Sequence, residues 1–122
     1  MIDITHAVEN TVAKSGIKTG ICTLFCTGST GSVTTIEYED GLLQDFPVAM
    51  ERIAPKEAVY QHHLRWRDGN GHSHIRASIL GPSLTVPFVN RSLTLGSWQQ
   101  ITFIDFDNKP RSRRLEVVLI GE

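Results

Sequence analysis

Hydrophobic residues recur at two different spacings along the chain, and together the two spacings predict a mixed α and β domain. In some stretches the apolar positions lie three to four residues apart, as on the buried face of a helix. Elsewhere they form short continuous runs or alternate with polar positions, as in strands. The expected helices cover residues 6–15, 40–53 and 73–80, and the expected strands cover residues 21–26, 33–38, 84–88, 92–95, 98–106 and 113–120.

Residues with strong backbone preferences mark the ends of these elements. Thr5 is a good N-cap for the first helix, and Gly16 is a good stop for it. Pro47 should kink the second helix or mark a restart, because its ring clashes with the preceding turn. Asn90 and Arg91 form a two-residue turn between two of the later strands. The pattern therefore predicts several short elements that follow one another closely along the sequence.

The order of the elements predicts the fold class. Two to three helices followed by a run of strands indicate an α+β domain with antiparallel β-sheets, arranged as a sandwich-like meander. The small-residue break at residues 28–32 is explained about equally well by a hairpin turn and by a phosphate-binding loop. With 122 residues the chain can form one core, so we expect a single domain over residues 1–122.

Charge and cysteine spacing narrow the classes of partner and compartment. The formal net charge of −1 argues against a nucleic-acid partner, which would call for a large basic excess. The sequence has no apolar run that would span a membrane and no signal peptide, so a cytoplasmic location is expected. Cys22 and Cys26 lie four apart in a predicted strand, about 13 Å from each other. They should stay unpaired, because a disulfide needs Cα atoms within about 7 Å.

Most of the residues suited to chemistry lie in one stretch, residues 66–77. Gly69 and Gly71 let the backbone approach a ligand closely, and the start of a helix near Ser73 favours anions. Arg67 and Arg76 are plausible anion clamps, since a guanidinium group meets a phosphate with two parallel hydrogen bonds. This stretch predicts a site for a small phosphorylated molecule. The later run of arginines at residues 111–114 is interpreted as solvated surface.

Four histidines lie in or near this stretch: His62, His63, His72 and His74. Three neutral imidazoles can hold a catalytic zinc ion and leave a fourth position for water or substrate. The spacing matches no standard zinc signature. Imidazoles that carry protons or bind phosphate explain the cluster equally well, and a histidine-rich surface loop is the simplest alternative.

Six short motifs, taken together, resemble a known family. They are Tyr60-Gln61-His62, Asp68-Gly69-Asn70-Gly71-His72-Ser73-His74, Leu80-Gly81-Pro82-Ser83, Leu95-Gly96-Ser97-Trp98-Gln99-Gln100, Asp105-Phe106-Asp107 and Arg111-Ser112-Arg113-Arg114. In content and order they are similar to motifs of the YjbQ-like family, also called the secondary thiamine-phosphate synthase family and long uncharacterised. The resemblance extends over nearly the whole chain.

The resemblance implies a compact α+β fold that assembles as a homotrimer. It also implies a weak thiamine-phosphate synthase activity, in which a hydroxymethylpyrimidine diphosphate is joined to a thiazole phosphate and pyrophosphate is released. The alternative is a trimer that binds a metal or a phosphorylated metabolite without catalysis. This chain departs from the family pattern at residues 28–30, since most members have His-Thr-[Ser/Thr] where it has Gly28-Ser29-Thr30.

The residue patterns and the resemblance together assign roles to particular residues. Catalytic roles are expected for His62, His74, Glu37 and Asp68. Substrate binding is expected for Asn70, Gly71, Ser73, Arg76, Ser29 and Thr30. A divalent metal, zinc or similar, is expected at His62, His72 and His74, with His72 replacing the family histidine that is absent at position 28.

Overall fold

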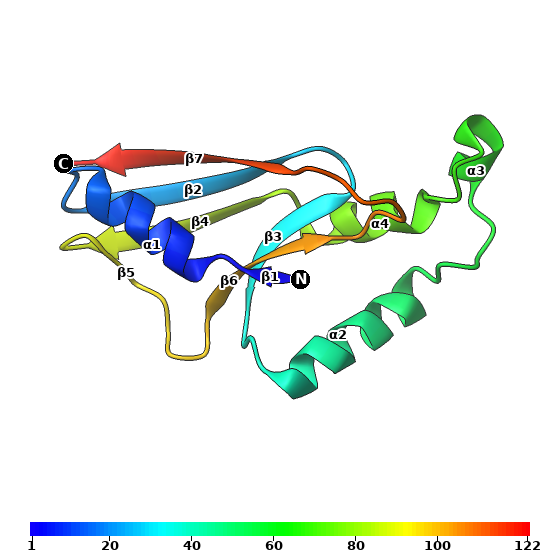
Figure 1. Cartoon of the computed structure of the whole chain (residues 1–122), viewed down its shortest axis with the longest axis horizontal. Coiled ribbons are helices and arrows are strands. Elements are labelled where there is room, and N and C mark those ends of the chain that lie inside the picture. The colour runs from blue at the N-terminus through cyan, green and yellow to red at the C-terminus, as the bar shows by residue number, and fades with distance from the viewer.

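Two antiparallel sheets and four helices make up the structure, a computed structural model that describes all of residues 1–122 (Figure 1). The helices are α1 (Thr5–Lys14), α2 (Asp40–Ile53), α3 (Gln61–Trp66) and α4 (Gly71–Leu80). The strands are β1 (Ile2–Asp3), β2 (Gly20–Thr27), β3 (Gly31–Ile36), β4 (Ser83–Val89), β5 (Ser92–Leu93), β6 (Gln100–Asp105) and β7 (Arg114–Gly121). The predicted α+β class with antiparallel sheets is confirmed, although the chain has one more helix than the upper number expected.

The strands connect differently from the predicted meander. The larger sheet has the order β5-β4-β2-β7 and the smaller one has the order β1-β6-β3. Only β4 and β5 form a hairpin, and its turn residues Asn90 and Arg91 both have positive φ angles of 51° and 63°. Because β2 and β3 belong to different sheets, the hairpin interpretation of residues 28–32 is wrong. That segment instead crosses from one sheet to the other.

The core lies between the two sheets and α1. Alternate residues of β2 point inward, so that Cys22, Leu24 and Cys26 are fully buried on one face. Cys22 and Leu24 pack with Val12 of α1 and with Phe88 of β4, among other apolar side chains. Burial of each large apolar side chain contributes about 2 kcal/mol to folding. The two cysteines are free, as their spacing predicts.

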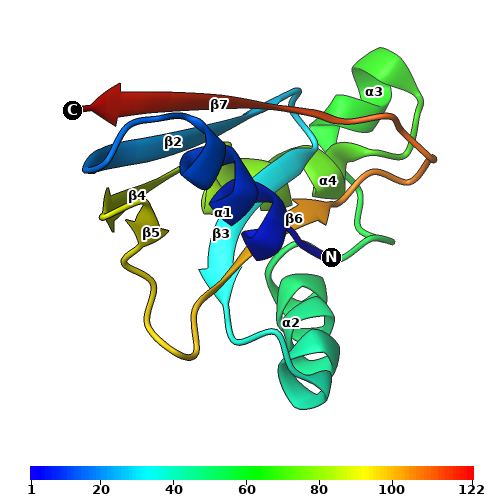
Figure 2. The same cartoon turned by 60° about the vertical axis from the view of Figure 1, so that its left-hand side comes forward.

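Helix α2 stands apart from both sheets (Figure 2). It begins where the Glu39 carboxylate accepts hydrogen bonds from the backbone N–H groups of Gly41 and Leu42. The helix then continues through Pro47 without a restart, and only Met50 is buried. None of the four helices has the length and apolarity needed to cross a membrane.

Helix α3 was not predicted, because its six residues carry no apolar face. Leu64 and Trp66 are both largely exposed, and the helix projects from the body of the molecule (Figure 1). It ends at Arg67, whose left-handed backbone (φ 50°) turns the chain back toward α4. Helix α4 begins at Gly71, two residues before the predicted start. These two helices carry the histidines of the candidate site.

Candidate functional site

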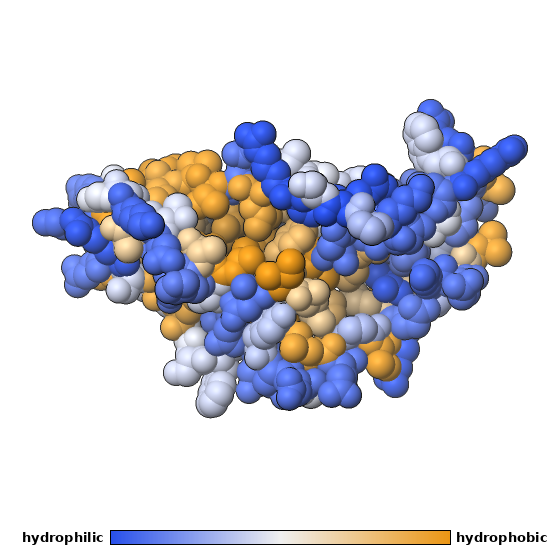
Figure 3. Space-filling model, viewed as in Figure 1, coloured by the Kyte–Doolittle hydropathy of each residue, from blue (hydrophilic) through white to orange (hydrophobic).

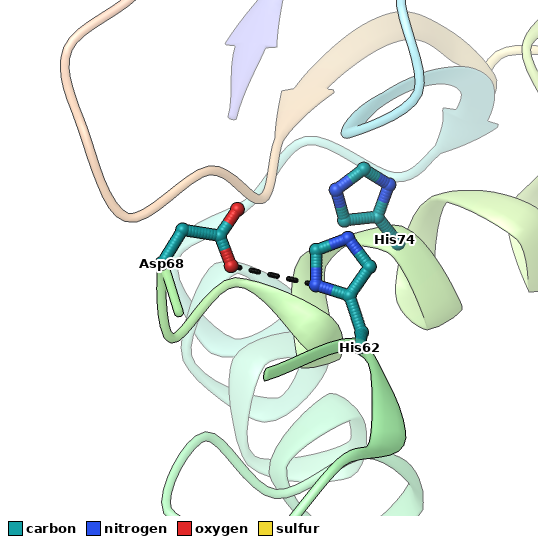
Figure 4. Close-up of side chains that lie close together, drawn as sticks. All are labelled: His62, Asp68 and His74. Atoms are coloured by element: carbon teal, nitrogen blue, oxygen red, sulfur yellow. Dashed lines mark ion pairs between the residues drawn. The ribbon is translucent and has the colours of Figure 1, made fainter. Parts of the chain in front are cut away.

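His62 of α3 and His74 of α4 meet with Asp68 of the connecting loop (Figure 4). The two imidazole rings have centroids 4.3 Å apart, and His62 Nδ1 lies 3.4 Å from Asp68 Oδ1. One ligand atom from each of the three residues lies within 4.8 Å of the other two. Two imidazoles and a carboxylate are a donor set that suits zinc and several other divalent metals. We call this group the His–Asp–His cluster.

The loop between α3 and α4 is held by its own hydrogen bonds. Asp68 Oδ1 accepts the backbone N–H of Asn70 at 3.1 Å, and Asn108 Nδ2 donates to the Asp68 carbonyl at 2.9 Å. Gly71 lets the two helices approach, because a Cβ there would lie 2.6 Å from the Cβ of Tyr60. Asp68 is therefore fixed on the side of the loop that faces His62.

At His74 and Asp68, burial and neighbouring groups favour the protonation states that a metal requires. Burial lowers the pKa of His74, and the nearby His62 lowers it further. Burial raises the pKa of Asp68, but the hydrogen bond from Asn70 and the charge of His62 outweigh this and leave it below its ordinary value. Neutral imidazole and ionised carboxylate are the ligand forms of these groups.

His72 does not join the cluster. Residues two apart on an α-helix point to opposite sides, so His72 and His74 cannot face the same ion. His72 is buried, its Nε2 lies 3.2 Å from Ser73 Oγ, and burial and the charge of Arg76 lower its pKa. The predicted set of His62, His72 and His74 therefore does not converge in the structure, and Asp68 is the third residue of the cluster.

Arg76 is engaged elsewhere. Its Nε and Nη2 donate to the carbonyl of Ala54 at 3.0 and 2.7 Å, and Nη2 also pairs with Glu51 at 2.6 Å. These contacts hold the C-terminal end of α2, where backbone carbonyls have no partner within the helix. The predicted role of Arg76 as an anion clamp is therefore not supported, because Nε and Nη2 are occupied inside the protein and Arg76 does not line the hollow beside His74.

Three other predicted residues lie away from the cluster. Glu37 is exposed just after the end of β3, whereas Thr30 precedes the start of that strand, roughly 20 Å away at the rise of an extended chain. Ser73 is buried and donates from Oγ to the carbonyl of Phe106. Gly71 is buried against Tyr60. Within one chain, none of the three reaches the cluster.

A hollow of about 250 Å³ opens beside His74, and no hydrophobic residue lines it. We call it the polar hollow. Its lining residues are Gly28, Ser29, Thr30, Asp68, Asn70, His74, Asp107, Arg111 and Arg113. Ser29, Thr30 and Asn70 were predicted as substrate-binding residues, and the structure brings all three to this place. Asn70 is almost fully buried, and its Oδ1 has no hydrogen-bond partner in the protein.

Asp107 organises one wall of the polar hollow. Its Oδ2 accepts from Thr30 Oγ1 at 2.9 Å and contacts Arg111 Nε at 3.2 Å and Arg113 Nη2 at 3.3 Å. Burial raises the pKa of Asp107, but hydrogen bonds from Thr30, the backbone N–H of Lys109, Arg111 and Asn70 bring it down to about 2. A carboxylate with so many donors acts as an anchor for its neighbours.

Arg113 corrects the interpretation of residues 111–114 as solvated surface. Its side chain is only 14% exposed, and Nε and Nη2 donate to the two oxygens of Asp105, each at 2.9 Å. The hydrogen bond from Arg113 to Asp105 raises the pKa of the guanidinium. Arg114 fits the original interpretation, with a side chain that is 79% exposed. The signal that was missed is the two-residue spacing shared by Asp105/Asp107 and Arg111/Arg113 across one turn.

Comparison with known proteins gives one consistent family. The family model described as "UPF0047 protein YjbQ-like" matches residues 1–122. A UPF0047 protein of Methanothermobacter thermautotrophicus is 41% identical over all of this chain and 83% of its own length. The UPF0047 protein YugU of Bacillus subtilis is 33% identical, over 99% of this chain and 89% of its own.

Solved structures show the same relationship. A protein of unknown function from Sulfolobus solfataricus superposes with a TM-score of 0.92 at 37% identity, over 99% of this chain and 86% of that one. An uncharacterised protein from Clostridium acetobutylicum gives a TM-score of 0.88 at 36% identity, over 98% of this chain and 89% of that one. Crystal structures of proteins that are 36% and 37% identical to this chain therefore show the same fold.

Proposed function

The chain belongs to the UPF0047 (YjbQ-like) family, and from this premise we propose that it binds a divalent metal ion together with a phosphorylated small molecule. The metal would be held by His62, Asp68 and His74. The phosphorylated molecule would occupy the polar hollow beside them. The observation that carries the proposal is the convergence of three ligand atoms within 4.8 Å at the edge of a hollow lined only by polar groups.

The residues present fit such a metal. His62 Nδ1 is buried and makes no hydrogen bond, since its 3.4 Å contact with Asp68 lacks hydrogen-bond geometry. A buried nitrogen without a hydrogen-bond partner destabilises the fold unless a proton donor or a metal ion binds it. A bound divalent metal would supply Lewis acidity toward a phosphoryl oxygen. Asp68 and the two histidines would hold it without a change in the fold of the loop.

Charge balance also supports a metal together with an anion. Asp68, Asp107, Arg111 and Arg113 line the hollow, and Asp105 pairs with Arg113, so these five groups together carry a formal charge of −1 when the histidines are neutral. A free phosphate would meet no excess of positive charge there. A divalent cation would reverse the sign and make the hollow attractive to a phosphorylated ligand.

For catalysis we propose the transfer that the family resemblance suggests. The bond between the pyrimidine methylene carbon and the diphosphate oxygen breaks, the thiazole nitrogen bonds to that carbon, and pyrophosphate leaves. The thiazole nitrogen already has a lone pair and no proton, so this displacement needs no general base. A mechanism without a general base is compatible with this chain, in which Glu37 lies far from the cluster. The work left to the protein is positioning and stabilisation of the departing negative charge.

Metal analysis tests the first part of the proposal. After loading with zinc and removal of the excess, we expect about one equivalent in the wild-type protein and about none in H74A. H6A is the matched control, because the side chain of His6 is 87% exposed on α1 and should not affect metal content. Wild-type protein that keeps no zinc would contradict the metal site.

An assay for thiamine phosphate separates the enzyme from the binding protein. Purified wild-type, H74A and H6A proteins are supplied with the pyrimidine diphosphate and the thiazole phosphate. Product from wild type and H6A but not from H74A supports the transferase. Zinc and ligand binding without product favours the non-catalytic alternative. Equal product from all three proteins would contradict a catalytic role for this cluster.

We further propose that the chain assembles as a homotrimer. The outward face of the four-stranded sheet exposes Ile21, Phe25, Val118 and Ile120 by 40% or more. No helix packs extensively against β2 or β7, the strands that carry these residues. The surface in Figure 3 is apolar over β2 and β7 and hydrophilic around the loop from β6 to β7. Light scattering should give about three times the 13.6 kDa chain mass, and V118K should lower it. A monomer would contradict the trimer.

A further inference from the structure

Asn70 stands at the start of helix α4, yet its side chain does not cap the helix. An asparagine in this position usually accepts a hydrogen bond from a backbone N–H group of the first turn, and Asn70 makes no such bond. The residue is only 3% exposed, and its Oδ1 is closed to solvent and has no hydrogen-bond partner in the protein. A buried amide oxygen without a partner destabilises the folded state, so the position of this side chain needs another explanation.

The orientation of the Asn70 amide follows from its contact with Asp107. A hydrogen bond from the Asn70 side chain is among the contacts that bring the pKa of Asp107 down to about 2, so Asp107 is ionised at neutral pH. An ionised carboxylate only accepts hydrogen bonds, and the amide nitrogen of Asn70 is therefore the atom that faces it. The amide oxygen is left for a different partner.

Asn70 lies next to the His–Asp–His cluster. Its backbone N–H donates to Asp68 Oδ1 at 3.1 Å, and its carbonyl accepts the backbone N–H of His74 at 3.4 Å. Residues four apart are neighbours on one face of a helix, and Asn70, Asp68 and His74 all line the polar hollow. His62 Nδ1, 3.4 Å from Asp68, is likewise buried without a hydrogen bond. Two buried atoms without partners thus belong to residues that surround the Asp68 carboxylate.

We propose that Asn70 Oδ1 is a fourth protein ligand of the metal ion that the His–Asp–His cluster holds. The inference rests on the proposed function for the presence of that ion. A bond between a metal ion and an oxygen ligand is about 2.1 Å long, whereas a hydrogen bond from water needs about 2.8 Å. An oxygen atom that no water molecule can touch is therefore still open to a metal ion, which comes closer and also satisfies His62 Nδ1.

A fourth ligand changes which ions the site favours. Amide and carboxylate oxygens suit Mn²⁺, whereas imidazole nitrogens suit Zn²⁺. Zinc should remain the more tightly bound ion, as in most sites of this kind, but the affinity for manganese should depend more strongly on Asn70. Manganese is usually six-coordinate, so four protein ligands leave two positions for oxygen atoms of the phosphorylated molecule.

Competition with a chelator, with Mn²⁺ and Zn²⁺ as separate probes, tests the fourth ligand. We expect N70A to lower the affinity for Mn²⁺ about tenfold or more and the affinity for Zn²⁺ about threefold or less. N108A is the matched control, because the exposed Asn108 holds the same loop through a 2.9 Å hydrogen bond to the Asp68 carbonyl. Both affinities of N108A should stay within about twofold of wild type. If N70A does not fold, N70D decides, since its carboxylate has a similar shape and should bind Mn²⁺ at least as tightly as wild type.

The outcomes separate this inference from the proposed function. An N70A protein that binds Mn²⁺ as wild type does would overturn the fourth ligand and leave the metal site of His62, Asp68 and His74 standing. Equal losses of affinity for the two ions would also overturn it, because a loosened loop weakens both alike. Weaker binding of Mn²⁺ by N70D would have the same meaning. Wild-type protein that binds neither ion would overturn the proposed metal site together with this inference.

Discussion

The imidazole rings of His62 and His74 lie with their centroids 4.3 Å apart and their planes inclined by 37°, although they belong to different helices. Two protonated imidazoles at this distance would repel each other, and Asp68 can offset only one of the two charges. At most one of the two rings should therefore carry an additional proton and a positive charge. A divalent ion can replace that proton and satisfy both rings.

The pH dependence of zinc binding is the first prediction. Zinc competes with protons for the two imidazoles, and burial together with His62 holds the pKa of His74 below its ordinary value of 6.5. Affinity should be nearly constant above about pH 7 and should fall at lower pH as protons displace the metal. Competition with a chelator of known affinity over this range measures it. An affinity that does not change down to about pH 5 would exclude histidine ligands.

The stability of the metal-free protein should fall on acidification. Burial lowers the pKa of both His72 and His74 in the folded state, whereas the unfolded chain takes up protons near pH 6.5. The unfolded state thus binds more protons below that pH, and the free energy of unfolding is highest above it. Urea denaturation at several pH values measures the slope, and H72L should reduce it. The two pH values of this comparison, about 5.5 and about 7.5, lie on either side of the ordinary histidine pKa of about 6.5. Greater stability at the lower pH would contradict the lowered pKa of His72 and His74 in the folded state.

Removal of the Asp107 charge should destabilise the loop from β6 to β7. D107N leaves Arg113 and Arg111 with one carboxylate fewer, and the Asp107 side chain is only 3% exposed. Breaking a buried ion pair typically costs about 3 kcal/mol. E116Q is the control, because it removes the exposed partner of Arg114 and should change stability by about 0.5 kcal/mol or less. Equal effects of the two substitutions in urea would show that Asp107 does not organise this wall.

Local patterns predicted most of the secondary structure, because those elements have strong sequence signals. The apolar run in β2 and the turn at Asn90 and Arg91 are set by short-range preferences that no distant contact overrides. Strand order is different, since β2 pairs with β4 and β7 across long stretches of chain. A single sequence has no local signal for such pairings, so the meander was mostly wrong.

The site was predicted in part for the same reason. The spacing of His72 and His74 suggested a shared ligand, but only knowledge that α4 begins at Gly71 reveals that they face opposite ways. Helix α3, which positions His62, lacks an apolar face and was missed. Arg113 was assigned to the surface, because burial of a charged residue depends on partners that the fold supplies.

Arg76 offers the clearest separation of a structural role from a binding role. R76M should lower the free energy of unfolding by about 1–2 kcal/mol, because the Ala54 carbonyl loses its hydrogen bonds and Glu51 loses its partner. Zinc content and pyrophosphate affinity should stay within about twofold of wild type, since Arg76 does not line the polar hollow. R52M is the control, because Arg52 is exposed on the same helix, α2, and should change stability little. A folded R76M protein that loses pyrophosphate binding would restore Arg76 as an anion clamp and would place the ligand on the other side of α4.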